Sequence, residues 1–244
     1  MRILIVHSHP EPKSFNGALT EVAVLTLRAA GHDVVISDLY RDGFSPLEGP
    51  EHYPDRLNKD RFSALAEQRH ASENASLSRE VQREIDRLKW ADLVVFQFPL
   101  WWHAQPAILK GWFDRVFVSG GLYTSRMRYD RGVFRGKRAI CSVTTGAPQE
   151  AFGPGARGGD MDQLMWPIHY SLHYMGFSVL PPFLAHGVQG HGYAYQSDDG
   201  YGQLLDDLKD DWAARLENLD RSRPLSFAGW NDWTEAGQLA KEQA

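Results

Sequence analysis

The residues best suited to chemistry are two adjacent tryptophans and a histidine, Trp101, Trp102 and His103. An apolar, β-branched run over residues 92–98 precedes them and predicts a buried strand, which Pro99 ends before a helical pattern begins. In an open α/β sheet, ligands bind in the crevice outside the carboxyl ends of the strands. Flat indole side chains at that position favour a flat ligand, and tryptophans that only anchor the loop to the sheet are the alternative.

A second polar group follows a short apolar run over residues 3–6, where Ser14 has the position of a helix N-cap. Free backbone N–H groups in the first helical turn, the positive end of the helix dipole, Asn16 and the nearby Lys13 are suited to binding a phosphate. An ordinary serine cap without a ligand gives the same pattern. The H-x-H pair just before it lacks a third ligand in a metal motif, so we expect no metal.

A third group, Thr144, Thr145, Gly146 and Ala147, follows the apolar run 139–144. Small residues there let backbone N–H groups approach the polar edge of a flat ring. A phosphate seat, indole faces and backbone donors together match a flavin better than a nucleoside triphosphate, because the motif G-x-x-x-x-G-K-S/T is missing. The glycine-rich run that follows also lacks its lysine and hydroxyl, and predicts a flexible lid.

Five apolar runs alternate with helical patterns, which predicts a parallel sheet covered by helices on both faces. The predicted strands are residues 3–6, 33–39, 93–98, 139–144 and 177–180. The predicted helices are residues 14–30, 77–90, a segment after Pro106, 160–175 with a break near Trp166 and Pro167, and 203–219. The turn after the first strand has no glycine, which argues against a dinucleotide-binding G-x-G-x-x-G and favours the flavodoxin-like strand order 2-1-3-4-5. In that order the loops after strands one, three and four meet.

Two segments lack a periodic pattern. Residues 40–75 form a connection much longer than usual, which we expect to be functional or to contact a partner. We expect one flavodoxin-like domain over residues 1–220 and a C-terminal extension over residues 221–244. Trp230 and Trp233 make this extension too aromatic for a solvated tail, so it should pack on the body or on a second protomer.

The composition limits the classes of protein to which this chain can belong. The 244 residues are 43% hydrophobic, which suits a single domain with a full core. A formal net charge of −5 gives no basic surface for a nucleic acid. The single cysteine, Cys141, lies in an apolar strand, which excludes an intramolecular disulfide and a cysteine metal cluster. Neither a signal peptide nor a run of ~18 apolar residues is present, so we expect a cytoplasmic protein without membrane insertion.

These motifs resemble those of the NAD(P)H:quinone oxidoreductase (DT-diaphorase) family, which has a flavodoxin-like fold. The similar stretches keep near-constant spacing over almost the whole chain: residues 4–9, 14–16, 37–40, 96–100, 106–113, 115–117, 144–146, 159–161, 166–168 and 215–218. The resemblance implies bound FAD, with FMN as the alternative, and NAD(P)H as co-substrate. It also implies a homodimer with its active site at the subunit interface.

By the same resemblance, three groups of residues contact the flavin. The group at its phosphate and ribityl end comprises His9, Phe15 and Asn16, beside the Ser14 cap. The group along its ring comprises Pro99, Leu100, Trp101 and Trp102. The group at its polar edge comprises Thr144, Thr145, Gly146 and Ala147, with Phe152 counted among the cofactor contacts. The implied substrate pocket comprises Trp102, His103, Tyr123 and Tyr174, and packing in the core or an interface is the alternative for the tyrosines.

The sequence departs from the family at several positions. Phe152 and Gly158 replace a tyrosine and a histidine that stabilise charge on the reduced flavin. We hypothesise that the neighbouring Arg157 supplies positive charge instead, as a catalytic residue. His103 replaces a phenylalanine of the aromatic pocket and is a second catalytic candidate, as a proton donor or a hydrogen-bonded wall residue. Ser63 stands near the position of a glutamine that reaches the flavin from the partner chain.

The resemblance therefore implies transfer of two electrons, as hydride, from NAD(P)H to flavin N5 and then to a quinone or a related aromatic, in ping-pong order. A flavodoxin-like ancillary subunit that regulates a membrane transporter is the alternative, with residues 40–75 as its docking surface. A one-electron flavodoxin carrier fits less well, because this chain is much longer and its aromatic loop suits a substrate.

Overall fold

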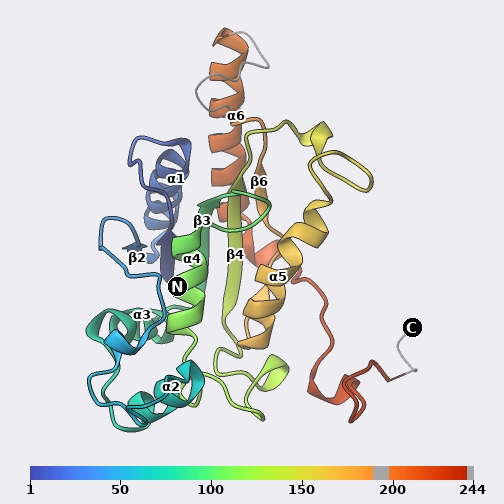
Figure 1. Cartoon of the computed structure of the whole chain (residues 1–244). Coiled ribbons are helices and arrows are strands. Elements are labelled where there is room, and N and C mark those ends of the chain that lie inside the picture. Colours follow the sequence, from blue (N-terminus) through green and yellow to red (C-terminus); the bar gives the residue numbers. More distant parts are fainter. Residues whose placement is uncertain (189–197, 241–244) are drawn as a thin grey trace.

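A six-stranded parallel sheet forms the centre of the computed structural model, which describes residues 1–188 and 198–240 (Figure 1). Its strands are β1 (Arg2–His7), β2 (Asp33–Asp38), β3 (Leu93–Pro99), β4 (Arg138–Thr144), β5 (Ser178–Val179) and β6 (Phe183–Ala185). The strand order β2-β1-β3-β4-β5 confirms the flavodoxin-like order expected from the sequence. β3 is buried along its whole length, as a central strand covered by helices on both faces must be.

The fifth position of the sheet is split between two short strands. β5 pairs with the start of β4, and β6 pairs with its end. Pro181 and Pro182 stand between them. Because proline has no N–H to donate to a ladder, a continuous edge strand cannot form there. The sequence predicted a single strand over residues 177–180 and missed β6.

Helices cover the sheet in two layers (Figure 1). They are α1 (Phe15–Ala29), α2 (Ala64–Glu73), α3 (Arg79–Trp90), α4 (Ala107–Val116), α5 (Met161–Tyr174) and α6 (Asp198–Glu217). Short 3-10 turns lie at Pro50–His52, Tyr129–Arg131, Gln149–Ala151, Leu219–Arg221 and Trp230–Asp232. α1 and α6 pack together on one face of the sheet, α3, α4 and α5 cover the other, and each face has its own apolar core. Among the described helices, none has the length and hydrophobicity needed to cross a membrane.

α2 lies inside the segment for which the sequence predicted no regular element. Its buried face is formed by Glu67, Gln68 and Ala71 rather than by large apolar residues. Arg56 Nε donates to Glu67 Oε1 at 2.9 Å, and Gln68 Nε2 donates to the Asp114 carbonyl at 2.9 Å. Because polar side chains take the core-facing positions, the helix has no apolar period, and only its tertiary partners account for their burial.

Two helices extend beyond their predicted limits. α5 continues through Pro167, where the sequence predicted a break, and buried Met165 and Ile168 anchor the helix on both sides of the proline. α6 begins at Asp198 rather than at residue 203. Glycine is a poor helix former, so the glycines in the first turns of α6 hid its start from sequence analysis.

The C-terminal segment runs back along the sheet edge and α5. The N–H of Leu225 donates to the Val179 carbonyl at 2.8 Å, and Phe227 stacks on His173 with ring centroids 4.8 Å apart. Further along, the rings of Trp230 and Trp233 approach the loop before β4. The domain boundary at residue 220 and the contact of this segment with a second protomer stay predictions.

Candidate functional site

A cavity of about 950 Å³ lies at the carboxyl ends of β1, β3 and β4. It is bounded by the start of α1, the loops after β3 and β4, and the N-terminal half of α6, which extends beyond the sheet (Figure 1). Its lining includes most of the residues that sequence analysis assigned to a flavin: His9, Ser14, Phe15, Asn16, Pro99, Leu100, Trp101, Thr144, Thr145 and Gly146. The three loops predicted to meet at this edge of the sheet do meet there.

The first turn of α1 is suited to holding a negative charge. Ser14 caps the helix by accepting a hydrogen bond from the backbone N–H of Gly17 at 3.2 Å, and no acidic side chain lies in that turn. Lys13 and Lys209 line the same cavity from two different elements, and Lys209 also pairs with Asp206 at 2.8 Å. The helix dipole and two ammonium groups together favour an anion such as a phosphate.

His9 is anchored to its own turn. Its Nδ1 lies 3.1 Å from the backbone nitrogen of Glu11 and 3.2 Å from the Glu11 carbonyl oxygen, and Nε2 makes no hydrogen bond to the described part of the chain. The ring meets Trp101 edge to face, with centroids 5.8 Å apart, and both residues line the cavity. The described residues include no group of three or more His, Cys, Asp or Glu that is able to hold a metal ion.

Buried polar side chains lie near the carboxyl ends of the three strands. Gln97 of β3 donates to Asn16 of α1, and the register places Gln97 beside Ser142 of β4. In the described part of the chain, Ser8 Oγ, Gln97 Oε1 and Ser142 Oγ are buried without a hydrogen-bond partner. Native proteins leave few such atoms buried without a partner, and ordered water satisfies many of them.

The loop after β3 contains a strained two-residue turn. Trp101 and Ala104 exchange backbone hydrogen bonds of 2.9 and 3.1 Å, and the two residues between them, Trp102 and His103, have φ values of 52° and 60°. This left-handed pair is the geometry of a type I′ turn, which favours Asn-Gly. The turn leaves Trp102 93% exposed and His103 exposed, and neither lines the cavity. The assignment of Trp102 to the ring wall stays a prediction.

The loop after β4 is fixed by a histidine that sequence analysis missed. Thr145 Oγ1 donates to the Ala147 carbonyl at 2.9 Å, so it must accept the bond from His186 Nδ1, also at 2.9 Å. Burial lowers the pKa of His186, which favours its neutral form. Thr145 and Gly146 line the cavity, whereas Ala147 does not. No motif in the sequence marks His186, because its partner lies in a different loop.

Phe152 and Gly158 occupy the positions where the sequence departs from the family it resembles. The Phe152 ring lies 5.1 Å from the His186 ring, outside the cavity lining. A Cβ added to Gly158 would lie 2.7 Å from the Ala151 carbonyl oxygen and 2.9 Å from the Phe152 ring, so a larger residue does not fit there. Arg157, between them in the turn, is exposed to solvent.

The two predicted substrate tyrosines lie at a different place. Tyr123 and Tyr174 meet edge to face with centroids 5.7 Å apart and line a cavity of about 350 Å³ between α2, α4 and α5. Burial raises the pKa of Tyr123, so its phenol stays protonated at neutral pH. This cavity shares no lining residue with the first one. Ser63 is the N-cap residue of α2.

The N-terminal half of α6 contributes side chains that sequence analysis did not assign to the site. Tyr201, Leu205 and Lys209 line the cavity at a spacing of four residues, and Val188 joins them. This spacing places the three on one face of a helix. The spacing was the available signal, but a helix face alone does not tell which cavity it meets.

Comparisons with known proteins show the fold and the family of the chain. A family model described as a flavodoxin-like fold matches residues 1–209, a range that contains every residue lining the cavity. The chain is 42% identical over 226 residues to ribosyldihydronicotinamide dehydrogenase (quinone) of Homo sapiens, covering 92% of this chain and 94% of that protein. It is 39% identical over 229 residues to NAD(P)H dehydrogenase (quinone) 1 of Cavia porcellus, covering 93% and 80% of the two chains.

The chain belongs to the NAD(P)H:quinone oxidoreductase family. A solved structure described as a quinone reductase, from Klebsiella pneumoniae, superposes on it with a TM-score of 0.87 at 34% identity, covering 98% of this chain and 93% of that one. As a member of the NAD(P)H:quinone oxidoreductase family, the chain is an oxidoreductase with a flavodoxin-like fold.

Proposed function

We propose that the protein is a flavin-dependent NAD(P)H:quinone oxidoreductase that binds FAD in the cavity at the carboxyl ends of β1, β3 and β4. The observation that carries this proposal is the meeting of three unlike groups in one cavity: the anion seat at the start of α1, the Trp101 indole, and the loop after β4. A flavin carries a group that suits each of the three: a phosphate for the anion seat, a flat ring for the indole, and a polar ring edge for the loop after β4. The relatives support the same reaction class.

The residues present fit this cofactor. Lys13, Lys209 and the first turn of α1 would hold its phosphate, and the His9 ring lines the same cavity. Trp101 would cover the ring, and Gly146 leaves room for a close approach, since an added Cβ would meet only the Val188 carbonyl, at 3.8 Å. When bound, the flavin supplies the acceptance of hydride from a nicotinamide and its delivery to a quinone, while the protein orients the reactants.

The α6 side of the cavity favours FAD over FMN. Tyr201 and Leu205 of α6 add an aromatic and an apolar surface to the lining, which suits the adenosine group that FAD has and FMN lacks. We expect Tyr201→Ala to weaken FAD binding to the apoprotein much more than FMN binding. Flavin titrations followed by fluorescence measure the dissociation constants of FAD and FMN. Equal losses for the two flavins would favour FMN as the cofactor.

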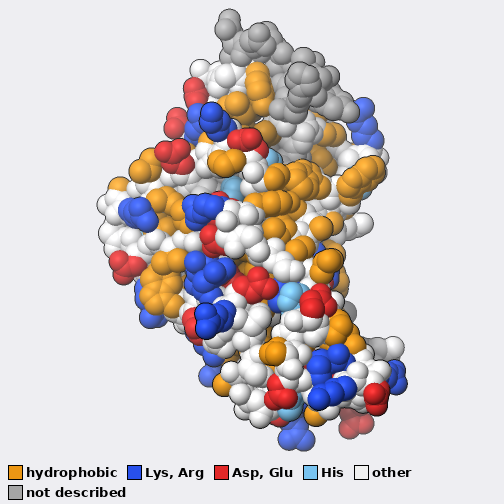
Figure 2. Space-filling model, turned by 60° about the vertical axis from the view of Figure 1, so that its left-hand side comes forward, with side chains coloured by type: hydrophobic (Ala, Val, Ile, Leu, Met, Phe, Trp, Pro, Cys, Tyr) orange, Lys and Arg blue, Asp and Glu red, His pale blue; other side chains and the backbone are white. Residues whose placement is uncertain are grey.

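We also propose a homodimer in which each active site uses both protomers. Tyr123 and Tyr174 line a cavity separate from the predicted flavin cavity of their own chain. Figure 2 shows hydrophobic side chains gathered in the middle of one face, and Trp102 is largely exposed. A partner that covers such surface would bring its tyrosines to the other protomer's ring site. Sedimentation velocity should show a dimer, and a fully active monomer would contradict this proposal.

Arg157 and His103 stay catalytic candidates. Arg157 is exposed, so its charge is free to approach an anionic reduced ring. We expect Arg157→Ala to slow flavin reduction by NADH in stopped-flow measurements, and Arg126→Ala, another exposed arginine, to leave the rate unchanged. An unaltered rate in Arg157→Ala removes this residue from the mechanism. His103→Phe should abolish a proton-dependent limb of the pH–rate profile if the imidazole donates a proton.

One experiment tests the function as a whole. The absorbance spectrum of the purified protein should show bound flavin, which NADH or NADPH bleaches under anaerobic conditions and menadione then restores. Comparing the two nicotinamides also determines which one the protein prefers. A yellow protein that neither nicotinamide bleaches would contradict the reductase, and a colourless protein that binds no added flavin would contradict the flavoprotein.

The alternative functions receive less support. The relatives are named as dehydrogenases rather than transporter subunits, so an ancillary role is not favoured. Residues 40–75 contain α2, whose Gln68 bonds to the Asp114 carbonyl of α4, so the segment has internal partners. The cytoplasmic location expected from the sequence stays a prediction.

A further inference from the structure

Two loops are joined at one side of the proposed flavin cavity: the loop after β4, which begins at Thr145, and the loop after β6, which contains His186. The N–H of Val188 donates to the Thr145 carbonyl and the N–H of Gly187 donates to the Ala147 carbonyl, each at 2.9 Å. These bonds use backbone atoms only, so they do not depend on which side chain residue 186 carries.

His186 adds a side-chain connection between the two loops. Its Nδ1 lies 2.9 Å from Thr145 Oγ1, which lies 2.9 Å from the Ala147 carbonyl oxygen. A hydroxyl has a single hydrogen, so both bonds exist together only when His186 Nδ1 carries a proton and donates it. The Phe152 ring lies beside the imidazole, with centroids 5.1 Å apart. The tautomer of His186 therefore decides whether the Thr145 hydroxyl is directed at Ala147.

The loop held in this way carries two unused backbone donors. The N–H groups of Gly146 and Ala147 make no hydrogen bond within the described residues. Gly146 is exposed and lines the flavin cavity, whereas Thr145 before it is buried and has its N–H, carbonyl and hydroxyl all bonded. Donors that are fixed before a ligand arrives stabilise its charge without a cost of reorganisation.

We propose that His186 is a positioning residue, whose hydrogen bond to Thr145 holds the loop after β4 in the conformation that stabilises reduced flavin. The inference rests on the proposed function, because it needs a flavin in the cavity. The polar edge of a flavin ring gains negative charge on reduction, so a fixed N–H beside it favours the reduced form over the oxidised form. Without the His186 bond the Thr145 hydroxyl rotates, and the loop is held less firmly.

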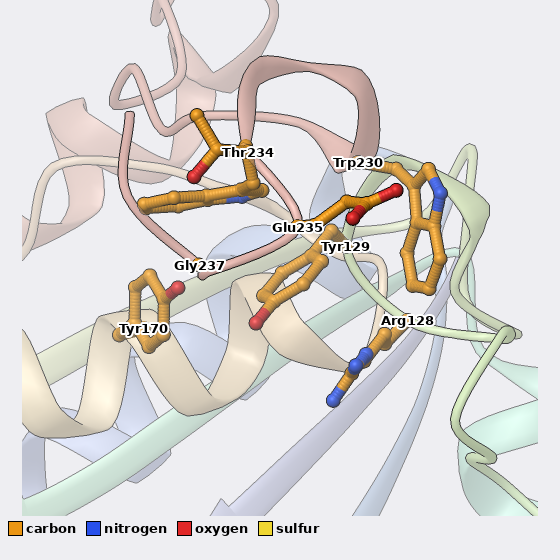
Figure 3. A pocket seen from close by; sticks show the side chains of 8 residues that line it. Arg128, Tyr129, Tyr170, Trp230, Thr234, Glu235 and Gly237 are labelled. Carbon is orange, nitrogen blue, oxygen red and sulfur yellow. The ribbon is translucent and has the colours of Figure 1, made fainter. Parts of the chain in front are cut away.

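The substrate side of the molecule does not include this connection. Figure 3 shows the aromatic cavity between the loop before β4, α5 and the C-terminal segment. Tyr170 lines both this cavity and that of the two predicted substrate tyrosines, and Arg128 Nη1 donates to the Tyr174 hydroxyl at 3.1 Å, so the two cavities form one region. Neither Thr145 nor His186 lines this region. A change at His186 therefore acts on the flavin side.

Two variants separate the hydrogen bond from the packing of the ring. His186→Phe keeps an aromatic ring beside Phe152 and removes the N–H, whereas His186→Asn keeps an amide N–H and removes the ring. We expect His186→Phe to weaken binding of reduced FAD about tenfold more than binding of oxidised FAD, which lowers the two-electron midpoint potential by about 30 mV. His186→Asn should restore most of this shift. FAD titrations of the apoprotein and redox titrations of the loaded protein measure both effects.

The matched control is His32→Phe, at the residue before β2 on the opposite edge of the sheet, and it should leave the affinity and the potential unchanged. A further measurement needs no flavin. NMR of the histidine-labelled protein at neutral pH should show the His186 proton on Nδ1, with the signal assigned by its loss in the variants. Circular dichroism reports whether each variant folds. If His186→Phe does not fold, Thr145→Val, which removes the oxygen that the imidazole bonds, takes its place.

The outcomes distinguish this inference from the proposed function. A native protein that binds no FAD would contradict both. A native protein that binds FAD keeps the proposed function, and three results would then overturn the role of His186 alone: an unchanged potential in His186→Phe, equal shifts in His186→Phe and His186→Asn, or a neutral His186 with its proton on Nε2.

Discussion

Gln97 and Asn16 connect the central strand to the first helix, with Gln97 Nε2 donating to Asn16 Oδ1 at 2.9 Å. Asn16 Nδ2 in turn donates to Thr144 Oγ1 at 2.9 Å. All three side chains are buried, and the chain of bonds joins β3, α1 and β4 below the proposed flavin cavity. A residue that does not line the cavity therefore fixes the orientation of two that do.

Gln97→Met should weaken both the fold and the flavin site. The variant leaves the buried Asn16 oxygen without a donor, which costs about 1–3 kcal/mol of unfolding free energy. Because Asn16 then loses its fixed orientation, we also expect weaker flavin binding. Urea unfolding and flavin titration measure the two effects. Gln82→Met, at an exposed residue bonded to Asp86, is the matched control and should change neither.

Two glycines in helices should respond to alanine with opposite signs. A Cβ at Gly111 of α4 would lie 2.1 Å from the Pro46 carbonyl oxygen, so Gly111→Ala should destabilise the protein by roughly 1–3 kcal/mol. A Cβ at Gly202 of α6 meets nothing within 4 Å, so Gly202→Ala should stabilise it by about 1 kcal/mol. Thermal unfolding of both variants checks the pair. A neutral Gly111→Ala would mean that α4 does not pack closely on residue 46.

Replacing Trp102 and His103 by Asn-Gly should raise stability and lower activity. Asn and Gly tolerate the left-handed backbone conformation of this turn, which costs most other residues roughly 1–2 kcal/mol each. We expect a higher melting temperature and a lower kcat/KM with menadione, because the replaced rings are proposed to meet the substrate. Ala75→Gly relieves similar strain away from the site, at φ 53°, and should raise the melting temperature alone. Unchanged activity in the double variant would remove both side chains from the site.

His169 should make the protein less stable in acid. Burial lowers its pKa from 6.5 to about 4, and its Nε2 has no hydrogen-bond partner in the described part of the chain. Between these two pH values the unfolded chain binds a proton that the folded chain does not, so stability falls as the pH falls. The unfolding free energy lost in this way is at most about 3 kcal/mol. His169→Leu should therefore be stabilising relative to the native protein at pH 4.5 but not at pH 8, in urea unfolding at each pH.

The sequence alone determined the sheet order and the three loops of the proposed flavin cavity. The apolar runs of β1, β3 and β4 are long enough to be buried on both faces, and the turn after β1 lacks the glycines of a dinucleotide site. Parallel strands bring their carboxyl ends to one edge. Trp101 closely follows β3, Thr144 ends β4, and Ser14 caps the helix that follows β1, so placing the strands also placed these residues.

Tertiary structure alone decided the features that depend on distant partners. α2 buries Glu67 and Gln68, whose burial is tolerable only because Arg56 and the Asp114 carbonyl meet them. His186 reaches Thr145 across 41 positions of sequence, and Trp230 reaches Arg128 from the C-terminal segment. Local patterns report which face of an element is apolar, but a polar contact between remote residues has no period. Such contacts exist only once the chain has folded.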